Sequence, residues 1–326
     1  MAVRERRSEA GDVAEAADRI GTAMESVLQG KREVIDLAIT VLLAGGHLLI
    51  EDVPGVGKTM LAKALARAID CSVRRVQFTP DLLPSDITGV SVWNAEARAF
   101  EFKAGAIFAN IVVGDEINRA SPKTQSALLE CMEEQQVTVD GISYLLEPPF
   151  LVLATQNPIE MEGTYPLPEA QRDRFTARIT IGYPAPDAEL EMIDSHGASD
   201  PLDELEPVID AAAVVKLIDA VRTIHVADSV RSYAVELVAE TRSTPQLRLG
   251  ASPRATLQLI RVARATAAID GRDYVVPDDI QALAAPVLAH RLLLSAEAQL
   301  ARRTPEEIVA DLVAGIGVPE PERRRR

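Results

Sequence analysis

The sequence predicts an α/β protein in which a three-layered αβα domain with a parallel sheet is followed by a smaller, all-helical domain. Short apolar segments alternate with helical patterns from residue 20 to about residue 183, which is typical of a parallel sheet with helices on both faces. A glycine-rich turn, residues 51–59, leads from one apolar segment straight into a helix. After the two prolines of "YPAPDAE", residues 183–189, the chain is helical almost throughout.

The strands and the domain limits follow from these patterns. We expect disorder in the charged, Ala-rich residues 1–16 and a solvated, charged tail at residues 319–326. The αβα domain then occupies residues 17–186, and the helical domain occupies residues 187–318. The predicted strands of the sheet are residues 47–51, 73–78, 111–115, 150–156 and 178–181.

Capping residues define two helices of the second domain. Ser252 and Pro253 open one helix as its N-cap and first-turn proline, and Gly271 closes it. The expected apolar face of this helix consists of Leu257, Ile260, Ala263 and Ala267. Thr304 and Glu307 have the spacing of a capping box and open a last helix.

Two inserts in the first domain, at about residues 82–104 and 133–148, each have the pattern of a β-hairpin. The Asp140-Gly141 pair lies between alternating segments and favours a tight turn. In "GVSVWNAEARAFEF", residues 89–102, alternating apolar residues flank a polar tip. From the sequence alone these hairpins are either surface decorations or working loops.

The composition excludes several classes of protein. With 326 residues, 47% of them hydrophobic, the chain can bury a sizeable core. No apolar run approaches the roughly 18 residues that span a bilayer, so we expect a cytoplasmic protein without membrane insertion. Cys71 and Cys131 are expected to be buried thiols rather than metal ligands. The net charge of −15 and the pI near 4.8 argue against non-specific binding to nucleic acid.

The segment "EDVPGVGKT", residues 51–59, nearly matches the phosphate-binding pattern G-x-x-x-x-G-K-[ST]. Asp52 stands where the pattern has its first glycine, at the strand exit, which is the position farthest from the phosphates. The other parts are present, because Lys58 can neutralise phosphates and Thr59 can ligate Mg²⁺. The residues predicted to bind the nucleotide here are Pro54, Gly55, Val56, Gly57, Lys58, Thr59 and Met60. The alternative is a glycine-rich turn without a ligand.

The segment "IVVGDE", residues 111–116, is an apolar strand that ends in two carboxylates. A buried strand has no structural use for such a pair. Asp115 can hold Mg²⁺ through water, and Glu116 can polarise an attacking water as a general base. Alone, this pattern fits a surface turn equally well. Its distance of 57 residues from Lys58 (115 − 58) favours the nucleotide site.

Further segments carry a family resemblance. Together with the two motifs above, "QFTPDLLPSDITG", "FANIVVGDEINRASPKTQSALLECMEE", "ATQNP", "EGTYPLPEAQRDRF" and "GASPRA" resemble the MoxR family of AAA+ ATPases, over roughly residues 20–290. The resemblance implies an AAA+ nucleotide-binding domain with a helical lid, and ATP and Mg²⁺ as cofactors. Related members also have Asp at the position of Asp52.

The resemblance implies roles for polar residues beyond the two motifs. Asn157 matches sensor 1, which helps to place the attacking water; alternatively, it is a turn-forming residue before Pro158. Arg174 matches the arginine finger, which stabilises charge on the γ-phosphate of a neighbouring subunit. Arg172 stands where relatives often have Leu, so the assignment of the finger to Arg172 or Arg174 stays open.

Two more matches concern the lid and the base of the nucleotide. Arg254 matches sensor 2, an arginine of the lid. It lies at a helix N-terminus, where the helix dipole disfavours a cation, and a phosphate partner would explain an arginine at this position. Gln29 and Gly30 resemble the segment whose backbone covers the adenine.

By the same resemblance, both hairpins are inserts that face the pore of a ring. Residues 133–147 contain no Lys or Arg, and the first insert balances Arg98 and Lys103 against Glu96 and Glu101. A motor that grips the phosphates of nucleic acid needs cations there, so a protein client is favoured over DNA or RNA.

The resulting prediction is a Mg²⁺-dependent ATPase that forms a homo-oligomeric ring, expected to be a hexamer, because Arg174 can act only on a neighbour's nucleotide. The resemblance implies a chaperone-like role in remodelling or assembling protein clients, with metal-cofactor insertion and a partner carrying a von Willebrand factor A domain as candidates. Two alternatives stay open: a nucleotide-controlled binding scaffold with little turnover, and a DNA-associated AAA+ motor.

Overall fold

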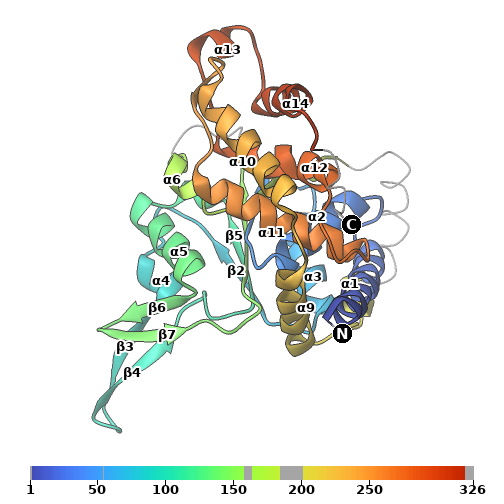
Figure 1. Ribbon diagram of the computed structural model, residues 1–326. Helices are drawn as coiled ribbons and strands as arrows, with labels where there is room; N and C mark the ends of the chain where they lie inside the picture. The colour runs from blue at the N-terminus through green and yellow to red at the C-terminus, as the bar shows by residue number, and fades with distance from the viewer. Residues whose placement is uncertain (1, 54, 158–163, 184–200, 320–326) are drawn as a thin grey trace.

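A five-stranded parallel sheet forms the centre of the first domain in the computed structural model, which describes residues 2–53, 55–157, 164–183 and 201–319 (Figure 1). The strand order is β2-β5-β8-β1-β9, and every pairing in the sheet is parallel. The carboxyl ends of the strands therefore meet at one edge of the sheet. Each predicted strand is confirmed to within two residues at either end, with bounds Leu48–Glu51 (β1), Val73–Gln77 (β2), Ile111–Asp115 (β5), Leu151–Gln156 (β8) and Ala177–Ile179 (β9).

Helices cover both faces of this sheet, as the pattern predicts. Alternate residues of a strand point to opposite faces, so Ile111 and Val113 join one hydrophobic cluster and Val112 joins the other. The first cluster includes side chains of α2 and α3 and continues into the lid, whereas the second includes side chains of α4 and α5. The bounds are Arg32–Leu43 (α2), Lys58–Ala68 (α3), Pro84–Thr88 (α4) and Pro122–Glu134 (α5).

The N-terminal segment is a helix, α1 (Ala2–Glu25), so the expected disorder of residues 1–16 is wrong for the described part of that segment. A stripe of residues at intervals of three and four is buried, and its members are Ala10, Val13, Ala17, Ile20 and Met24. The helix packs against α2, α3, α9 and α11. Burial of the stripe stabilises a segment whose composition alone suggested fraying.

The second domain is helical over residues 201–319, as predicted, with one short antiparallel strand pair added. Figure 1 shows α10, α13 and α14 at the top of the molecule, away from the hairpins. No helix in the described parts of the chain is both long and apolar enough to cross a membrane. The elements are α8 (Pro201–Glu204), α9 (Ala211–Thr223), α10 (Asp228–Ser243), β10 (Leu247–Leu249), α11 (Pro253–Ile269), α12 (Pro277–Leu288), β11 (Leu293–Leu294), α13 (Ala296–Leu300) and α14 (Pro305–Gly315).

The predicted start residues hold at both helices, with Ser252 as N-cap and Pro253 in the first turn of α11 and Thr304 as N-cap of α14, whereas the predicted apolar face of α11 changes. Thr304 and Glu307 form the predicted capping box, with reciprocal side-chain to backbone bonds of 3.2 and 3.0 Å. The predicted apolar face of α11 is wrong at Leu257, which is 63% exposed, whereas Leu259 and Val262 are fully buried. Ala263 and Ala267 of the predicted face are fully buried, so the prediction is confirmed there and wrong only at Leu257.

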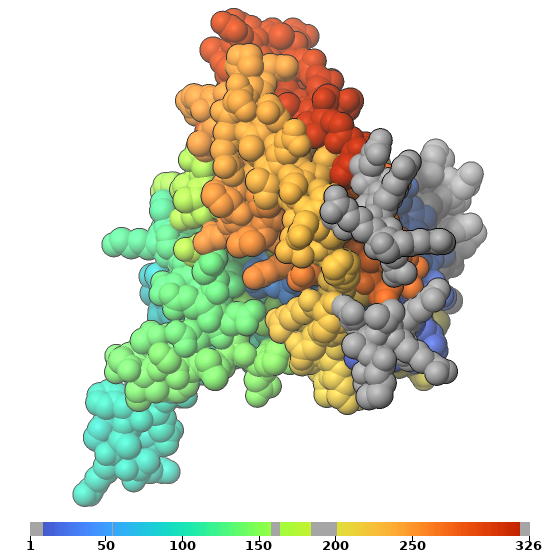
Figure 2. Space-filling model, in the orientation of Figure 1, coloured from blue at the N-terminus to red at the C-terminus, as the bar shows by residue number. Residues whose placement is uncertain are grey.

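Both inserts form β-hairpins, as predicted, and the first projects from the body as an arm (Figure 2). The ring of Phe102 stacks on Tyr144 with centroids 4.0 Å apart, which joins the first hairpin to the second. Trp93 and Phe100, nearer the tip, are 53% and 71% exposed and contact each other edge to face. The paired strands are β3 (Gly89–Asn94) with β4 (Ala99–Ala104), and β6 (Gln136–Val139) with β7 (Ile142–Leu145).

Candidate active site

The turn between β1 and α3 places Lys58 and Thr59 in the first turn of a helix. Gly55 and Gly57 have φ angles of +86° and +92°, in the left-handed region that favours glycine. The first N–H groups of a helix have no partner within it, so this turn is suited to an anion. The Nζ atom of Lys58 donates to the backbone oxygen of Asp52 at 2.6 Å.

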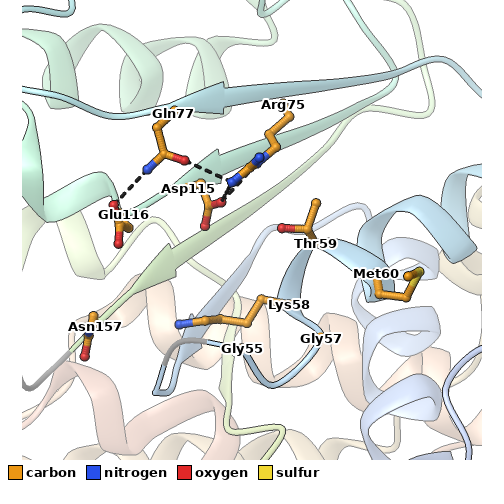
Figure 3. Close-up of a pocket in the computed structure, with 10 residues that line it drawn as sticks. All are labelled: Gly55, Gly57, Lys58, Thr59, Met60, Arg75, Gln77, Asp115, Glu116 and Asn157. Carbon is orange, nitrogen blue, oxygen red and sulfur yellow. Dashed lines mark hydrogen bonds and ion pairs between the residues drawn. The ribbon is translucent and has the colours of Figure 1, made fainter. Parts of the chain in front are cut away.

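A pocket of about 460 Å³ opens beside this turn (Figure 3). Of the residues predicted from the sequence, it brings together Gly55, Gly57, Lys58, Thr59, Met60, Asp115, Glu116 and Asn157. It adds two residues that were not predicted, Arg75 and Gln77 of β2. Val56 packs against the hydrophobic core instead, and Pro54 lies outside the described residues.

Asp115 ends β5 and is 8% exposed. Its Oδ1 accepts a hydrogen bond from Thr155 Oγ1 at 2.6 Å. Its Oδ2 accepts from Arg75, at 3.0 Å from Nε and 2.5 Å from Nη2. The carboxylate is therefore fixed between a neutral donor on β8 and a cation on β2.

Glu116 follows in a left-handed conformation, with φ of +57°. A residue other than glycine in this region is strained by about 1–3 kcal/mol, which the surroundings must offset. The backbone N–H of Glu116 donates to Thr155 Oγ1 at 2.9 Å. Its Oε2 accepts from Gln77 Nε2 at 2.8 Å and from Arg119 Nη1 at 2.9 Å. These bonds hold the carboxylate in the pocket, where its other oxygen can act on a ligand.

Asn157 directly follows β8, is 5% exposed and lines the pocket. In Figure 3 the side chain of Lys58 extends toward it. Because β5 and β8 are parallel neighbours, Glu116 and Asn157 leave the sheet at the same edge. This position suits the predicted sensor 1.

The predicted adenine segment lies in the turn between α1 and α2. The side chain of Leu28 lies close to Gly57 of the phosphate loop. A Cβ atom placed on Gly57 would be 3.6 Å from Cδ2 of Leu28. Gln29 has a buried Oε1 atom without a hydrogen-bond partner among the described residues, and Gly30 has φ of +67°. Neither Gln29 nor Gly30 lines the pocket beside Lys58.

Arg254 also lies away from the pocket of its own chain. Its Nη2 is 3.1 Å from Glu133 Oε1, and its Nη1 is 3.8 Å from Asp173 Oδ2. Asp173 stands between Arg172 and Arg174, the two candidates for the arginine finger. The predicted sensor 2 and the predicted finger segment are therefore neighbours.

Arg172 is the last residue of α6 (Glu169–Arg172), Arg174 lies two residues further along the chain, and both are half-buried. Neither lines the pocket with Lys58. The Nε atom of Arg172 is buried without a partner among the described residues. The choice of finger between the two stays a prediction.

A parallel αβα sheet with a phosphate loop after β1, two carboxylates after β5, a polar side chain after β8 and a helical lid defines the AAA+ class of ATPases. Residues 47–177 match the family model "ATPase family associated with various cellular activities (AAA)", and residues 239–312 match "AAA lid domain". Over 91% of the chain and 81% of the relative, the sequence is 39% identical to the chaperone MoxR1 of Mycobacterium tuberculosis. The chain belongs to the MoxR family of AAA+ ATPases.

Two further relatives match along nearly the whole chain. The uncharacterized protein YeaC of Bacillus subtilis is 50% identical over 92% of this chain and 95% of its own length. A solved structure from Cytophaga hutchinsonii, provisionally assigned as an ATPase, superposes with a TM-score of 0.90 at 36% identity, covering 98% of this chain and all of that one.

Proposed function

We propose that this protein hydrolyses ATP with Mg²⁺ in a homo-oligomeric ring and uses the energy to remodel or assemble protein clients. The observation that carries the proposal is the meeting of Lys58, Thr59, Asp115, Glu116 and Asn157 in one pocket. Phosphoryl transfer requires a phosphate-binding cation, oxygen ligands for a metal ion, a base and a group that positions the water, and these five side chains supply them.

The phosphate loop would bind the triphosphate. Because the first N–H groups of a helix have no partner within the helix, the first turn of α3 is suited to the phosphates, and Lys58 would exchange the backbone oxygen of Asp52 for phosphate oxygens. Hydroxyl and carboxylate oxygens are ligands that Mg²⁺ prefers, so Thr59 and Asp115 fit the metal. When bound, Mg²⁺ neutralises charge on the β- and γ-phosphates.

Glu116 would take a proton from the attacking water while the water oxygen bonds to the γ-phosphorus and ADP leaves. Its bonds from Gln77 and Arg119 hold the carboxylate at the end of β5. Asn157, at the same edge of the sheet, would orient that water.

The positions of the arginines support a site shared between subunits. Arg254 lies beside Asp173, next to Arg172 and Arg174, and none of these arginines lines the pocket of its own chain. A cation that does not face its own nucleotide can serve the nucleotide of a neighbour in a closed ring. We therefore assign Arg254 as well as the finger to the neighbouring subunit's site, and we propose six subunits from the family resemblance.

The two hairpins favour a protein client over nucleic acid. The first of them is the arm. Its exposed Trp93 and Phe100 offer apolar contact area, and the second hairpin has no Lys or Arg between residues 133 and 147. One relative is named a chaperone. Metal-cofactor insertion and a partner with a von Willebrand factor A domain are part of this proposal.

The test measures ATP hydrolysis per subunit as protein concentration rises, for wild type, Lys58→Ala and Arg174→Ala. We expect the wild-type rate to climb as subunits assemble, and both variants to be inactive alone. Mixing the two variants would place an intact loop beside an intact finger and recover about a quarter of the wild-type rate under random assembly. Inactive mixtures of assembled subunits would contradict a shared site. The experiment is repeated with Arg172→Ala in place of Arg174→Ala. The finger is the arginine whose variant is inactive alone and regains activity when it is mixed with Lys58→Ala.

A further inference from the structure

Asp52 occupies the position at which phosphate-binding loops have their first glycine, and it is 7% exposed. Its Oδ2 accepts two backbone N–H groups, from Ile181 at 2.7 Å and from Gly182 at 2.6 Å. Its Oδ1 accepts the N–H of Val53 at 2.8 Å. A glycine could make none of these side-chain bonds, so the departure from the pattern has a structural use.

Lys31 holds the same segment, residues 181–183, through its carbonyl groups. Its Nζ donates to the backbone oxygens of Ile181 at 2.7 Å, Gly182 at 3.2 Å and Tyr183 at 2.9 Å. The N–H groups of the segment thus meet a carboxylate, and its carbonyl groups meet an ammonium. Hydrogen bonds to ionised groups are stronger than neutral ones, so the segment is held firmly by both charges.

The two charges belong to the two segments that the proposed nucleotide site uses. Asp52 begins the phosphate loop, and its backbone oxygen accepts the Nζ of Lys58 at 2.6 Å. Lys31 directly follows Gln29 and Gly30, the predicted adenine segment. The held segment, residues 181–183, begins two residues after the end of β9, where the chain leaves the sheet toward the lid.

We propose that Asp52 is a positioning residue that couples the phosphate loop to the segment leaving the sheet for the lid. The inference rests on the proposed function, because it assigns Lys58 to ATP. When Lys58 turns to phosphate, the backbone oxygen of Asp52 loses an ammonium partner and the loop start readjusts. The carboxylate carries this readjustment to Ile181 and Gly182, and so to the first residues of the connection to the lid.

The test compares Asp52→Gly, which restores the common residue, with Asp52→Asn, which keeps the shape but replaces one oxygen by an N–H donor. Hydrogen exchange of the Ile181 and Gly182 amides is followed with and without a non-hydrolysable ATP analogue and Mg²⁺. Asp210→Asn is the matched control, because Asp210 Oδ1 also accepts a backbone N–H, that of Ala213 at 2.7 Å, at the start of α9.

We expect the two amides to exchange at least about tenfold faster in Asp52→Gly than in wild type or Asp210→Asn. The analogue should change their exchange in wild type and in the control, but in neither Asp52 variant. Affinity for the analogue should stay within about threefold, because Lys58 and Thr59 remain, whereas turnover falls by about tenfold or more. A purely structural role would not remove the response to nucleotide while leaving its binding intact.

Unchanged exchange in Asp52→Gly, or a nucleotide response that persists in both Asp52 variants, would overturn the proposal. Loss of analogue binding in both variants would also overturn it, because Asp52 would then serve binding itself. Failure of the proposed function looks different: wild type would bind the analogue no better than Lys58→Ala, while the exchange difference between wild type and Asp52→Gly without nucleotide would persist.

Discussion

Asp173 and Arg291 form a buried ion pair that joins the predicted finger segment to the lid. Arg291 Nε donates to Asp173 Oδ1 at 3.0 Å, and Arg291 Nη2 donates to the backbone oxygen of Phe175 at 2.6 Å. Burial lowers the pKa of Arg291 to about 10, which leaves it charged at neutral pH. Asp173 also accepts the hydroxyl of Ser252, at the start of the helix that carries Arg254, at 2.8 Å. The lid therefore fixes the backbone on both sides of Arg174.

Arg291→Met should lower the free energy of unfolding by about 3 kcal/mol, because it leaves the Asp173 carboxylate without its main cation. Urea denaturation measures the change. Arg222→Met is the control, since its pair with Asp219 is mostly exposed and should contribute less than about 1 kcal/mol. Equal small losses in the two variants would contradict a stabilising role for the buried pair.

Glu116→Gln should bind ATP but hydrolyse it at least about 100-fold more slowly, because an amide cannot take a proton from water. Steady-state hydrolysis and equilibrium binding of a fluorescent nucleotide separate the two effects. Glu130→Gln, on the exposed side of α5, should behave as wild type. Hydrolysis that survives in Glu116→Gln would contradict the role of Glu116 as the base, whereas negligible hydrolysis by wild type and variant alike would favour the binding scaffold.

Arg75→Ala should lower the Mg²⁺ concentration needed for half-maximal hydrolysis by about threefold or more, because Arg75 competes with a metal ion for Asp115. A Mg²⁺ titration at fixed ATP measures this. Arg74→Ala is the control, since neighbouring residues of β2 point to opposite faces. A higher Mg²⁺ requirement in Arg75→Ala would mean that Arg75 supports the metal site instead.

His47 should make stability depend on pH. Burial lowers its pKa to about 4, partly offset by the backbone oxygen of Met132, whereas the unfolded side chain titrates near 6.5. The stabilisation is present above pH 6.5 and is lost as the pH falls toward 4. We expect a loss of about 2 kcal/mol between pH 7 and pH 5 from this group, and His290 acts in the same direction. Urea denaturation of His47→Gln should show a flatter pH profile than that of His225→Gln, an exposed control.

The sheet and the core of the site could be predicted from the sequence because both depend on local pattern. Buried parallel strands appear as apolar runs, and the motifs at their ends led us to expect Asp115 and Glu116 beside Lys58. Asn157 was expected there from the resemblance to the MoxR family. The hairpins followed from alternation around a turn pair. These features need no knowledge of distant contacts.

The rest depends on tertiary contacts that local pattern does not encode. Arg75 and Gln77 lie on a strand whose side chains are mostly exposed, and only the neighbouring β5 makes them part of the pocket. Arg254 was expected at a phosphate, but the orientation of the lid places it beside Asp173. The helix at the N-terminus did have a signal, the apolar spacing of Val13, Ile20 and their neighbours, which the high Ala content obscured.

The stacked rings of Phe102 and Tyr144 connect the two hairpins, so that they form one continuous projection. Its root is α5, which runs into β6 through Gln135 and is reached from Glu116 through a single short 3₁₀ turn, Ile117–Arg119. Thr124 of α5 ties this root to the base of the other hairpin by donating to the backbone oxygen of Leu82 at 2.7 Å. We therefore expect a pull on Trp93, near the tip of the arm, to reach Glu116, the residue proposed to activate water, through α5.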